Sequence, residues 1–190
     1  LRAPLVANRR PGEGRGVMAT VADVREEIVP VGNGRVDMRV QVRGSGPPLV
    51  FLHPAAGFPH SRDLHETIEL AALLGVKRVI TMSGTPGGEP NTAVPVWNPL
   101  PWWSPFLDVR DHQWSVAIPY WKDIQARAAT ADVKVAIEMH PGNIVFNPST
   151  MHRLAESVDA THVGAEMDPS HLFWQGIDPV LAVADLGELV

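Results

Sequence analysis

The sequence contains no cysteine, which excludes disulfide bonds, thiolate metal sites and cysteine nucleophiles. It also lacks any apolar run that approaches the ~18 residues of a membrane-spanning helix. The first residues include several arginines but no apolar segment of the kind that a secretory signal requires. These absences predict a cytoplasmic protein with no membrane partner.

Basic side chains are also scarce. The chain of 190 residues has 16 Lys and Arg against 21 Asp and Glu, a formal net charge of −5. Proteins that bind nucleic acid normally present a basic face, so this balance argues against such a partner. Hydrophobic residues make up 45% of the sequence, which is enough for one ordinary domain with a core.

The N-terminal third is expected to contain a disordered leader at residues 1–23 and a β-rich segment at residues 24–59. Gly32-Asn33-Gly34 is a hairpin turn signal, and apolar and polar residues alternate over 36–43. A short apolar strand at 49–52 then ends at His53-Pro54. This segment resembles the first strands of an α/β-hydrolase, but the Gly-x-Ser-x-Gly turn that would carry the nucleophile is absent: Thr81 and Thr85 flank Ser83, the nearest candidate. We therefore predict no hydrolytic role.

From residue 60 onward the pattern predicts alternating helices and strands. Asp63 and Glu66 form a capping box for a helix that ends at Gly75. Later helices are predicted to begin near Pro119, Pro148 and Pro179, because proline is favoured in the first turn of a helix. Strands are predicted at 76–82, 133–138 and 163–168. This order predicts an α/β fold built from successive βα units, which form a parallel sheet.

Residues 84–118 are expected to form a long loop. The segment is rich in proline and carries Trp97, Trp102, Trp103 and Trp114. Loops of this length within a compact domain are usually functional, and an aromatic loop above the strand ends would act as a lid or wall for a polar ligand. The alternative is that the tryptophans only pack the loop onto the body.

The strand at 133–138 ends in Glu138, and His140 follows just before Pro141-Gly142. A similar pattern returns at 162–171, where Asp168 ends the next strand and His171 follows. Barrel enzymes place catalytic residues at the C-terminal ends of successive strands. Two carboxylates at one mouth repel each other unless a cation or a shared proton lies between them, so the pattern predicts a divalent metal site.

Each residue also has a purely structural interpretation. Glu138 alone could be a buried acid paired with Lys or Arg, and Asp168 could form an Asx turn before Pro169. Either histidine could be a satisfied structural residue. Glu166 shares its side of the strand with Asp168 but is predicted to lie deeper, and it is assigned no role. The repetition of the motif favours a site.

Four stretches of residues 60–190 together resemble the xylose isomerase-like TIM-barrel proteins of the sugar phosphate isomerase and epimerase group. They are residues 70–84, 118–122, 138–143 and 168–179. The last two, Glu-Met-His-Pro-Gly-Asn and Asp-Pro-Ser-His-Leu-Phe-Trp-Gln-Gly-Ile-Asp-Pro, are long and specific. The resemblance implies a partial TIM barrel of this type, preceded by the β-rich segment.

In that family a metal ion is typically held by Glu, Asp, His and a second Glu on four successive strands. The resemblance implies that Glu138 and Asp168 are the first two ligands of a Mn²⁺, Mg²⁺, Co²⁺ or Zn²⁺ ion. Glu138 would also be the proton-transfer base, and His140, His171 and Trp174 would contact a sugar or sugar phosphate. The last two ligands would lie on strands beyond Val190, so we expect a truncated or fused product that binds metal weakly and turns over slowly.

The function implied by the resemblance is metal-dependent isomerisation or epimerisation of a sugar or sugar phosphate. One alternative is a non-catalytic fragment that retains the motifs. Another is an AP-endonuclease-like phosphodiesterase on the same barrel, which requires more histidine ligands and a basic face for the nucleic acid backbone. Assembly into a homo-oligomer is left open.

Overall fold

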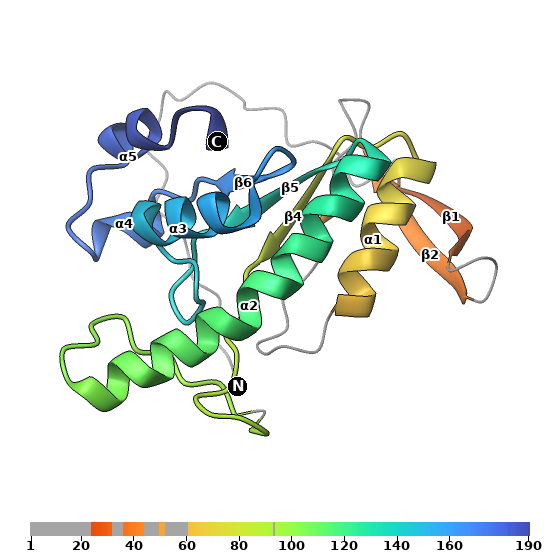
Figure 1. The fold of residues 1–190 in the computed structure, drawn as a ribbon. Coiled ribbons are helices and arrows are strands. Elements are labelled where there is room, and N and C mark those ends of the chain that lie inside the picture. Colours follow the sequence, from red (N-terminus) through yellow and green to blue (C-terminus); the bar gives the residue numbers. More distant parts are fainter. Residues whose placement is uncertain (1–23, 32–35, 44–49, 52–60, 93) are drawn as a thin grey trace, which may run out of the picture.

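The computed structural model describes residues 24–31, 36–43, 50–51, 61–92 and 94–190 (Figure 1). The predicted leader, the hairpin turn at 32–34 and the boundary predicted at residues 59–60 lie outside this part of the chain. Within it, the strands are β1 Val24–Val31, β2 Val36–Arg43, β3 Val50–Phe51, β4 Arg78–Met82, β5 Lys134–Glu138 and β6 Val163–Glu166. The helices are α1 Ser61–Leu73, α2 Ser104–Ala131, α3 Pro148–Val158, α4 Ser170–Phe173 and α5 Pro179–Leu186, and a short 3₁₀ turn follows at Gly187–Leu189.

Four of the strands form a parallel sheet in chain order, β3-β4-β5-β6. β3, from the segment that resembles a hydrolase, thus belongs to the same sheet as the later strands. β1 and β2 form a separate antiparallel hairpin, which lies beside α1 in Figure 1. Sequential parallel strands joined by helices are the arrangement of a βα barrel, so the described sheet is part of such a barrel.

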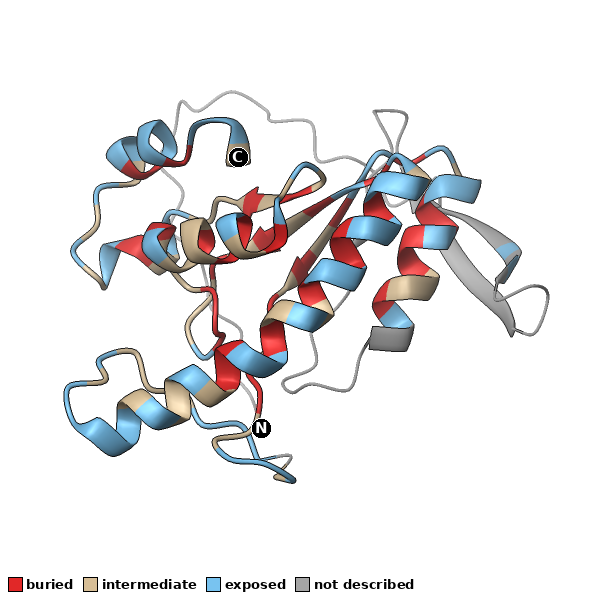
Figure 2. Cartoon of the chain, in the orientation of Figure 1, coloured by how far each residue is buried: buried red, intermediate tan, exposed pale blue. Residues whose placement is uncertain are grey.

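Helices α1, α2 and α3 lie side by side on one face of the sheet (Figure 1). Val135 and Ile137 of β5 are fully buried against these helices, in one core with Trp121 and Ile124 of α2. Figure 2 shows the buried residues along the sheet and the facing sides of the helices. Because side chains alternate along a strand, Glu138 must point to the opposite face of the sheet.

The predicted helix starts are confirmed: α3 begins at Pro148 and α5 begins at Pro179. Each helix is preceded by a residue whose side chain caps it. Asn147 caps α3, and its Oδ1 accepts a hydrogen bond of 3.0 Å from the backbone N–H of Thr150. Asp178 caps α5, and its Oδ1 accepts from the N–H of Val180 at 2.8 Å. Each side chain satisfies an N–H group that the first turn of a helix leaves unpaired.

The prediction of a loop over 84–118 followed by a helix from Pro119 was wrong. Helix α2 begins at Ser104, and Pro119 lies in its interior. Pro105 is the proline of the first turn, and Trp114 and Ala117 are buried before Pro119 is reached. The gain from burying these side chains outweighs the backbone hydrogen bond that an interior proline removes.

The only tyrosine of the sequence, Tyr120, provides a test of the packing between α1 and α2. Burial, followed by the negative charges of Asp123 and Asp63, raises the pKa of Tyr120 to about 12, against ~10 for an exposed tyrosine. The neutral phenol is therefore favoured in the folded chain. The stabilisation that Tyr120 gives the folded chain is fully present below pH ~10, where the phenol is neutral in both states. It is lost as the pH rises toward about 12.

We expect the near-ultraviolet tyrosinate absorbance of the folded chain to appear well above pH ~10, while the urea-unfolded chain titrates near ~10. A folded chain that titrates at the same pH as the unfolded chain would contradict this packing.

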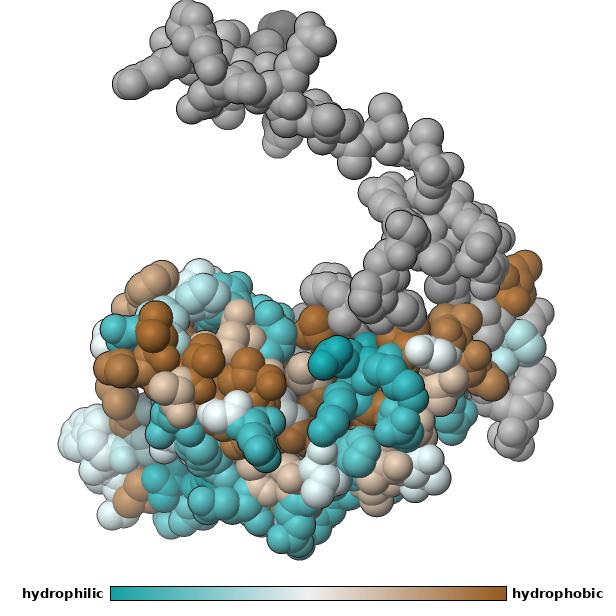
Figure 3. Space-filling view, turned by 90° about the horizontal axis from the view of Figure 1, so that it is seen from above, coloured by the Kyte–Doolittle hydropathy of each residue, from teal (hydrophilic) through white to brown (hydrophobic). Residues whose placement is uncertain are grey.

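Within the described residues, no helix is long and apolar enough to cross a bilayer. The exposed apolar side chains are concentrated in a few places, and one of them is α5, where Val180 and Leu181 are largely exposed. In the view from above, hydrophobic side chains gather over the end of the molecule where α5 lies (Figure 3).

Candidate functional site

Glu138 is the last residue of β5 and lies next to Glu166 of β6 in the sheet register. The strand carries its side chain on the face opposite the helices. Nε2 of His171 lies 3.1 Å from Oε1 of Glu138, and both side chains are about four-fifths buried. The structural alternative for Glu138, a pair with Lys or Arg, is not seen: the ion pair of Glu138 in the described part of the chain is with His171.

His140 and His171 come from different segments and meet beside Glu138. Their ring centroids are 4.3 Å apart, with an angle of 69° between the ring planes. Nδ1 of His140 lies 2.6 Å from the carbonyl oxygen of Pro141. Since a carbonyl only accepts, Nδ1 is the donor in this contact, which leaves Nε2 as the nitrogen with a lone pair when the ring is neutral. The three residues each offer one ligand atom, and these atoms lie within 4.8 Å of one another.

Asp168 lies at the edge of this group. Its Oδ2 is 3.5 Å from Nε2 of His171, and its Oδ1 accepts a 2.8 Å hydrogen bond from the backbone N–H of Ser170. Hydrogen bonds from the side chain and backbone of Ser170 lower the pKa of Asp168. Asp168 therefore forms an Asx turn, as its structural interpretation predicted, and its other carboxylate oxygen lies near His171.

Glu166 is the residue that the sequence did not place. It lines a cavity of about 270 Å³ together with Glu138 and Asp168. Burial raises the pKa of Glu166, and the charges of Glu138 and Asp168 raise it further. The sequence indicated only that Glu166 lies on the same side of its strand as Asp168. That Glu166 also lies next to Glu138 follows from the register of β5 and β6.

The loop that carries His140 is tied to the end of β4 by Asn143, which is buried. Oδ1 of Asn143 accepts from the N–H of Gly84 at 2.9 Å, and Nδ2 donates to the carbonyl of His140 at 3.1 Å. The hydroxyl of Ser83 accepts from the N–H of Val145 at 3.0 Å. Ser83 thus has a structural role, and these bonds hold His140 at the C-terminal edge of the sheet.

Trp174, predicted to contact substrate, lies just after α4, and 53% of it is exposed. Its ring packs against Trp97, whose other neighbour is Phe146, with centroid distances of 6.1 Å and 5.5 Å. Trp174 lines neither the cavity of about 270 Å³ nor the three-residue group. Of the predicted tryptophan-rich wall, Trp97 packs onto the body, whereas Trp102 and Trp103 are exposed.

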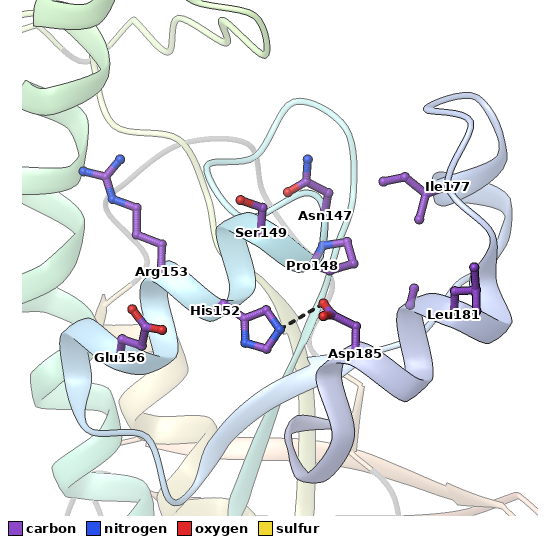
Figure 4. A pocket seen from close by; sticks show the side chains of 10 residues that line it. Asn147, Pro148, Ser149, His152, Arg153, Glu156, Ile177, Leu181 and Asp185 are labelled. Atoms are coloured by element: carbon purple, nitrogen blue, oxygen red, sulfur yellow. Dashed lines mark hydrogen bonds and ion pairs between the residues drawn. The ribbon is translucent and has the colours of Figure 1, made fainter.

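A larger groove of about 770 Å³ lies elsewhere, between α3 and α5 (Figure 4). His152 and Asp185 form an ion pair of 3.0 Å across it. Arg153 and Glu156 also line it, so its charges are mixed. The groove lies on the helix side of the sheet, away from Glu138.

The donor set of Glu138, His140 and His171 fits a divalent metal ion. One carboxylate and two imidazoles suit Zn²⁺, Co²⁺ or Mn²⁺ better than Mg²⁺, which prefers oxygen ligands. That Glu138 and Asp168 are both metal ligands stays a prediction. The geometry adds His140 and His171 to the candidate ligands.

Comparisons with known proteins agree with this fold. The family described as the xylose isomerase-like TIM barrel matches residues 50–189. The uncharacterized protein YfiH of Bacillus subtilis (strain 168) is 44% identical over 138 residues, which are 70% of this chain and 44% of YfiH. The chain therefore spans less than half the length of this curated relative.

Among solved structures, the probable 3-DHS dehydratase AsbF of Bacillus anthracis aligns with a TM-score of 0.54 at 16% identity, over 75% of this chain and 46% of AsbF. An L-ribulose 3-epimerase aligns with a TM-score of 0.53 at 19% identity, over 68% of this chain and 40% of the epimerase. The 3-keto-D-glucoside 4-epimerase YcjR of E. coli aligns with a TM-score of 0.53 at 16% identity, over 68% of this chain and 47% of YcjR. These similarities concern the fold. With four parallel strands whose helices cover one face, and with the family match over residues 50–189, the chain belongs to the xylose isomerase-like TIM-barrel family and forms part of such a barrel.

Proposed function

We propose that the chain carries part of the site of a metal-dependent isomerase or epimerase that acts on a sugar or sugar phosphate. The observation that supports this most is the meeting of Glu138, His140 and His171, whose ligand atoms lie within 4.8 Å of one another. They lie at the C-terminal ends of parallel strands, where barrel enzymes place their catalytic residues. Two relatives of similar fold are named as sugar epimerases.

In this proposal Glu138, His140 and His171 hold the ion, and Asp168 lies beside His171 as the second carboxylate. When bound, the ion would polarise the oxygens of the sugar as a Lewis acid. The carboxylate of Glu138 would remove a proton from the carbon next to the sugar carbonyl and return one to it. Trp174, with its exposed face beside α4, would contact the substrate.

Proton exchange tests this function even when turnover is slow. A ketose incubated with the chain and Mn²⁺ in D₂O should exchange the hydrogen next to its carbonyl with solvent, as followed by ¹H NMR. In this proposal Glu138 alone transfers protons, so we expect slow exchange. The exchange should stop with a chelator and with Glu138→Gln.

Two outcomes would contradict the proposal. Exchange that is insensitive to both the chelator and Glu138→Gln would exclude the proposed base and ion. A chain that binds no divalent ion would favour the non-catalytic alternative.

A further inference from the structure

Gln175 lies two residues beyond α4, and its side chain joins the two segments that carry the site histidines. Its Nε2 donates to the carbonyl oxygen of His171 at 2.8 Å and to the carbonyl oxygen of Phe146 at 3.0 Å. Its Oε1 accepts from Nδ2 of Asn147 at 3.3 Å. His171 belongs to α4, whereas Phe146 and Asn147 belong to the loop that follows His140 and leads into α3.

The helix that carries His171 cannot hold its own position. α4 has four residues, Ser170–Phe173, and a single helical turn is unstable in isolation because nucleation is unfavourable. Its place must come from contacts with the rest of the chain. Leu172, fully buried, supplies the apolar contact, and Gln175 supplies hydrogen bonds to the neighbouring loop.

The other end of this connection is rigid. Asn147 is the N-cap of α3 and is fixed in a capping box with Thr150. The backbone N–H of Phe146 donates to the hydroxyl of the same threonine at 3.0 Å. Gln175 therefore ties α4 to the capped start of an eleven-residue helix that packs in the core.

We propose that Gln175 is a positioning residue that sets the distance of His171 from Glu138 and His140. The claim about metal affinity rests on the proposed function, but the claim about ring position does not. Without the donors of Nε2, the segment of α4 would keep only the 3.3 Å bond from Asn147 as its connection through Gln175 to the loop. The 3.1 Å contact between His171 and Glu138 would then loosen. Residues that orient metal ligands typically change metal affinity ~10- to 100-fold when replaced.

The test compares Gln175→Met with Gln125→Met. Methionine keeps the length of glutamine but has no N–H donor. Gln125 is a buried glutamine that, like Gln175, makes several hydrogen bonds, among them one of 3.0 Å from the N–H of Val163. It lies at the opposite end of the strands from Glu138, so its loss should lower stability without moving the site.

Two readouts are needed. In the metal-free chain, NMR should detect an NOE between the rings of His140 and His171, whose centroids are 4.3 Å apart. We expect this NOE to be lost in Gln175→Met and kept in Gln125→Met. In calorimetric titrations with Co²⁺, Gln175→Met should raise Kd ~10- to 100-fold, while Gln125→Met should leave Kd unchanged despite its lower stability in urea.

If Gln175→Met shows the same NOE and the same Kd for Co²⁺ as the unsubstituted chain, the proposal is overturned. If the unsubstituted chain binds no Co²⁺, the proposed function fails, and the NOE alone then decides the role of Gln175. If Gln175→Met does not fold, Gln175→Glu serves instead. It keeps the acceptor for Asn147 and loses both donors, and the same changes are expected.

Discussion

Replacing Glu138 with glutamine is expected to weaken the binding of Mn²⁺ or Co²⁺ by at least ~100-fold, because the loss of a direct ligand should exceed the effect of an outer-shell change. Glu138 is the only carboxylate among the three residues whose ligand atoms converge. An amide of the same shape has no negative charge and binds hard cations poorly. Calorimetric titration of the purified chain measures the change.

Glu156→Gln is the matched control. Glu156 is an exposed residue of α3 and lines the groove on the helix side of the sheet, so its replacement removes the same charge away from the site. The control should bind the ion as the unsubstituted chain does. Equal loss of affinity in both variants would indicate a general effect of charge and would contradict the assignment of Glu138.

Trp121→Ala is expected to have the largest effect on folding. Trp121 is fully buried at the centre of the face of α2 that packs on the sheet. Removing a buried aromatic side chain typically lowers the free energy of unfolding by ~3–5 kcal/mol. Since domains are typically stable by only ~5–15 kcal/mol, this is a large share of the total. Urea unfolding followed by circular dichroism measures the difference.

Trp102→Ala provides the comparison, because 83% of Trp102 is exposed. Its replacement should change the free energy of unfolding by less than ~0.5 kcal/mol. Similar losses in the two variants would contradict the assignment of Trp121 to the core and Trp102 to the surface.

The sequence was sufficient wherever the signal is local. Asn147-Pro148 and Asp178-Pro179 each combine a capping side chain with a proline in the first turn, and both start helices as predicted. Gly75, predicted to end the first helix, has a φ of +71°, which glycine adopts readily. The apolar runs at 133–138 and 163–168 form the strands that place the site, although β6 ends at Glu166, two residues before the predicted end at Asp168.

Signals that depend on tertiary contacts were missed. Pro105 and Pro119 both look like helix starts, and only the burial of Trp114 and Ala117 shows that the helix runs through the second proline. Helix α4 is too short to leave a periodic pattern, and its position depends on Leu172 and Gln175.

The candidate site shows the same division. Glu138 was predictable because it ends an apolar strand, and the repeated motif identified Asp168 and the two histidines as candidates. That His171 contacts Glu138 directly at 3.1 Å follows from the placement of α4, which no local pattern encodes. Glu166 joins the same cavity because of the strand register.

The proposed function depends above all on whether Glu138, His140 and His171 form one divalent metal site. The most direct measurement is a titration of the unsubstituted chain with Zn²⁺, in which the imidazole resonances of the histidines are followed by NMR. One equivalent of metal is expected to shift the ring resonances of His140 and His171. The resonances of His152, which pairs with Asp185 in the other groove, should not change. Binding of less than one equivalent without a change at His140 and His171, or a shift at His152 instead, would contradict it.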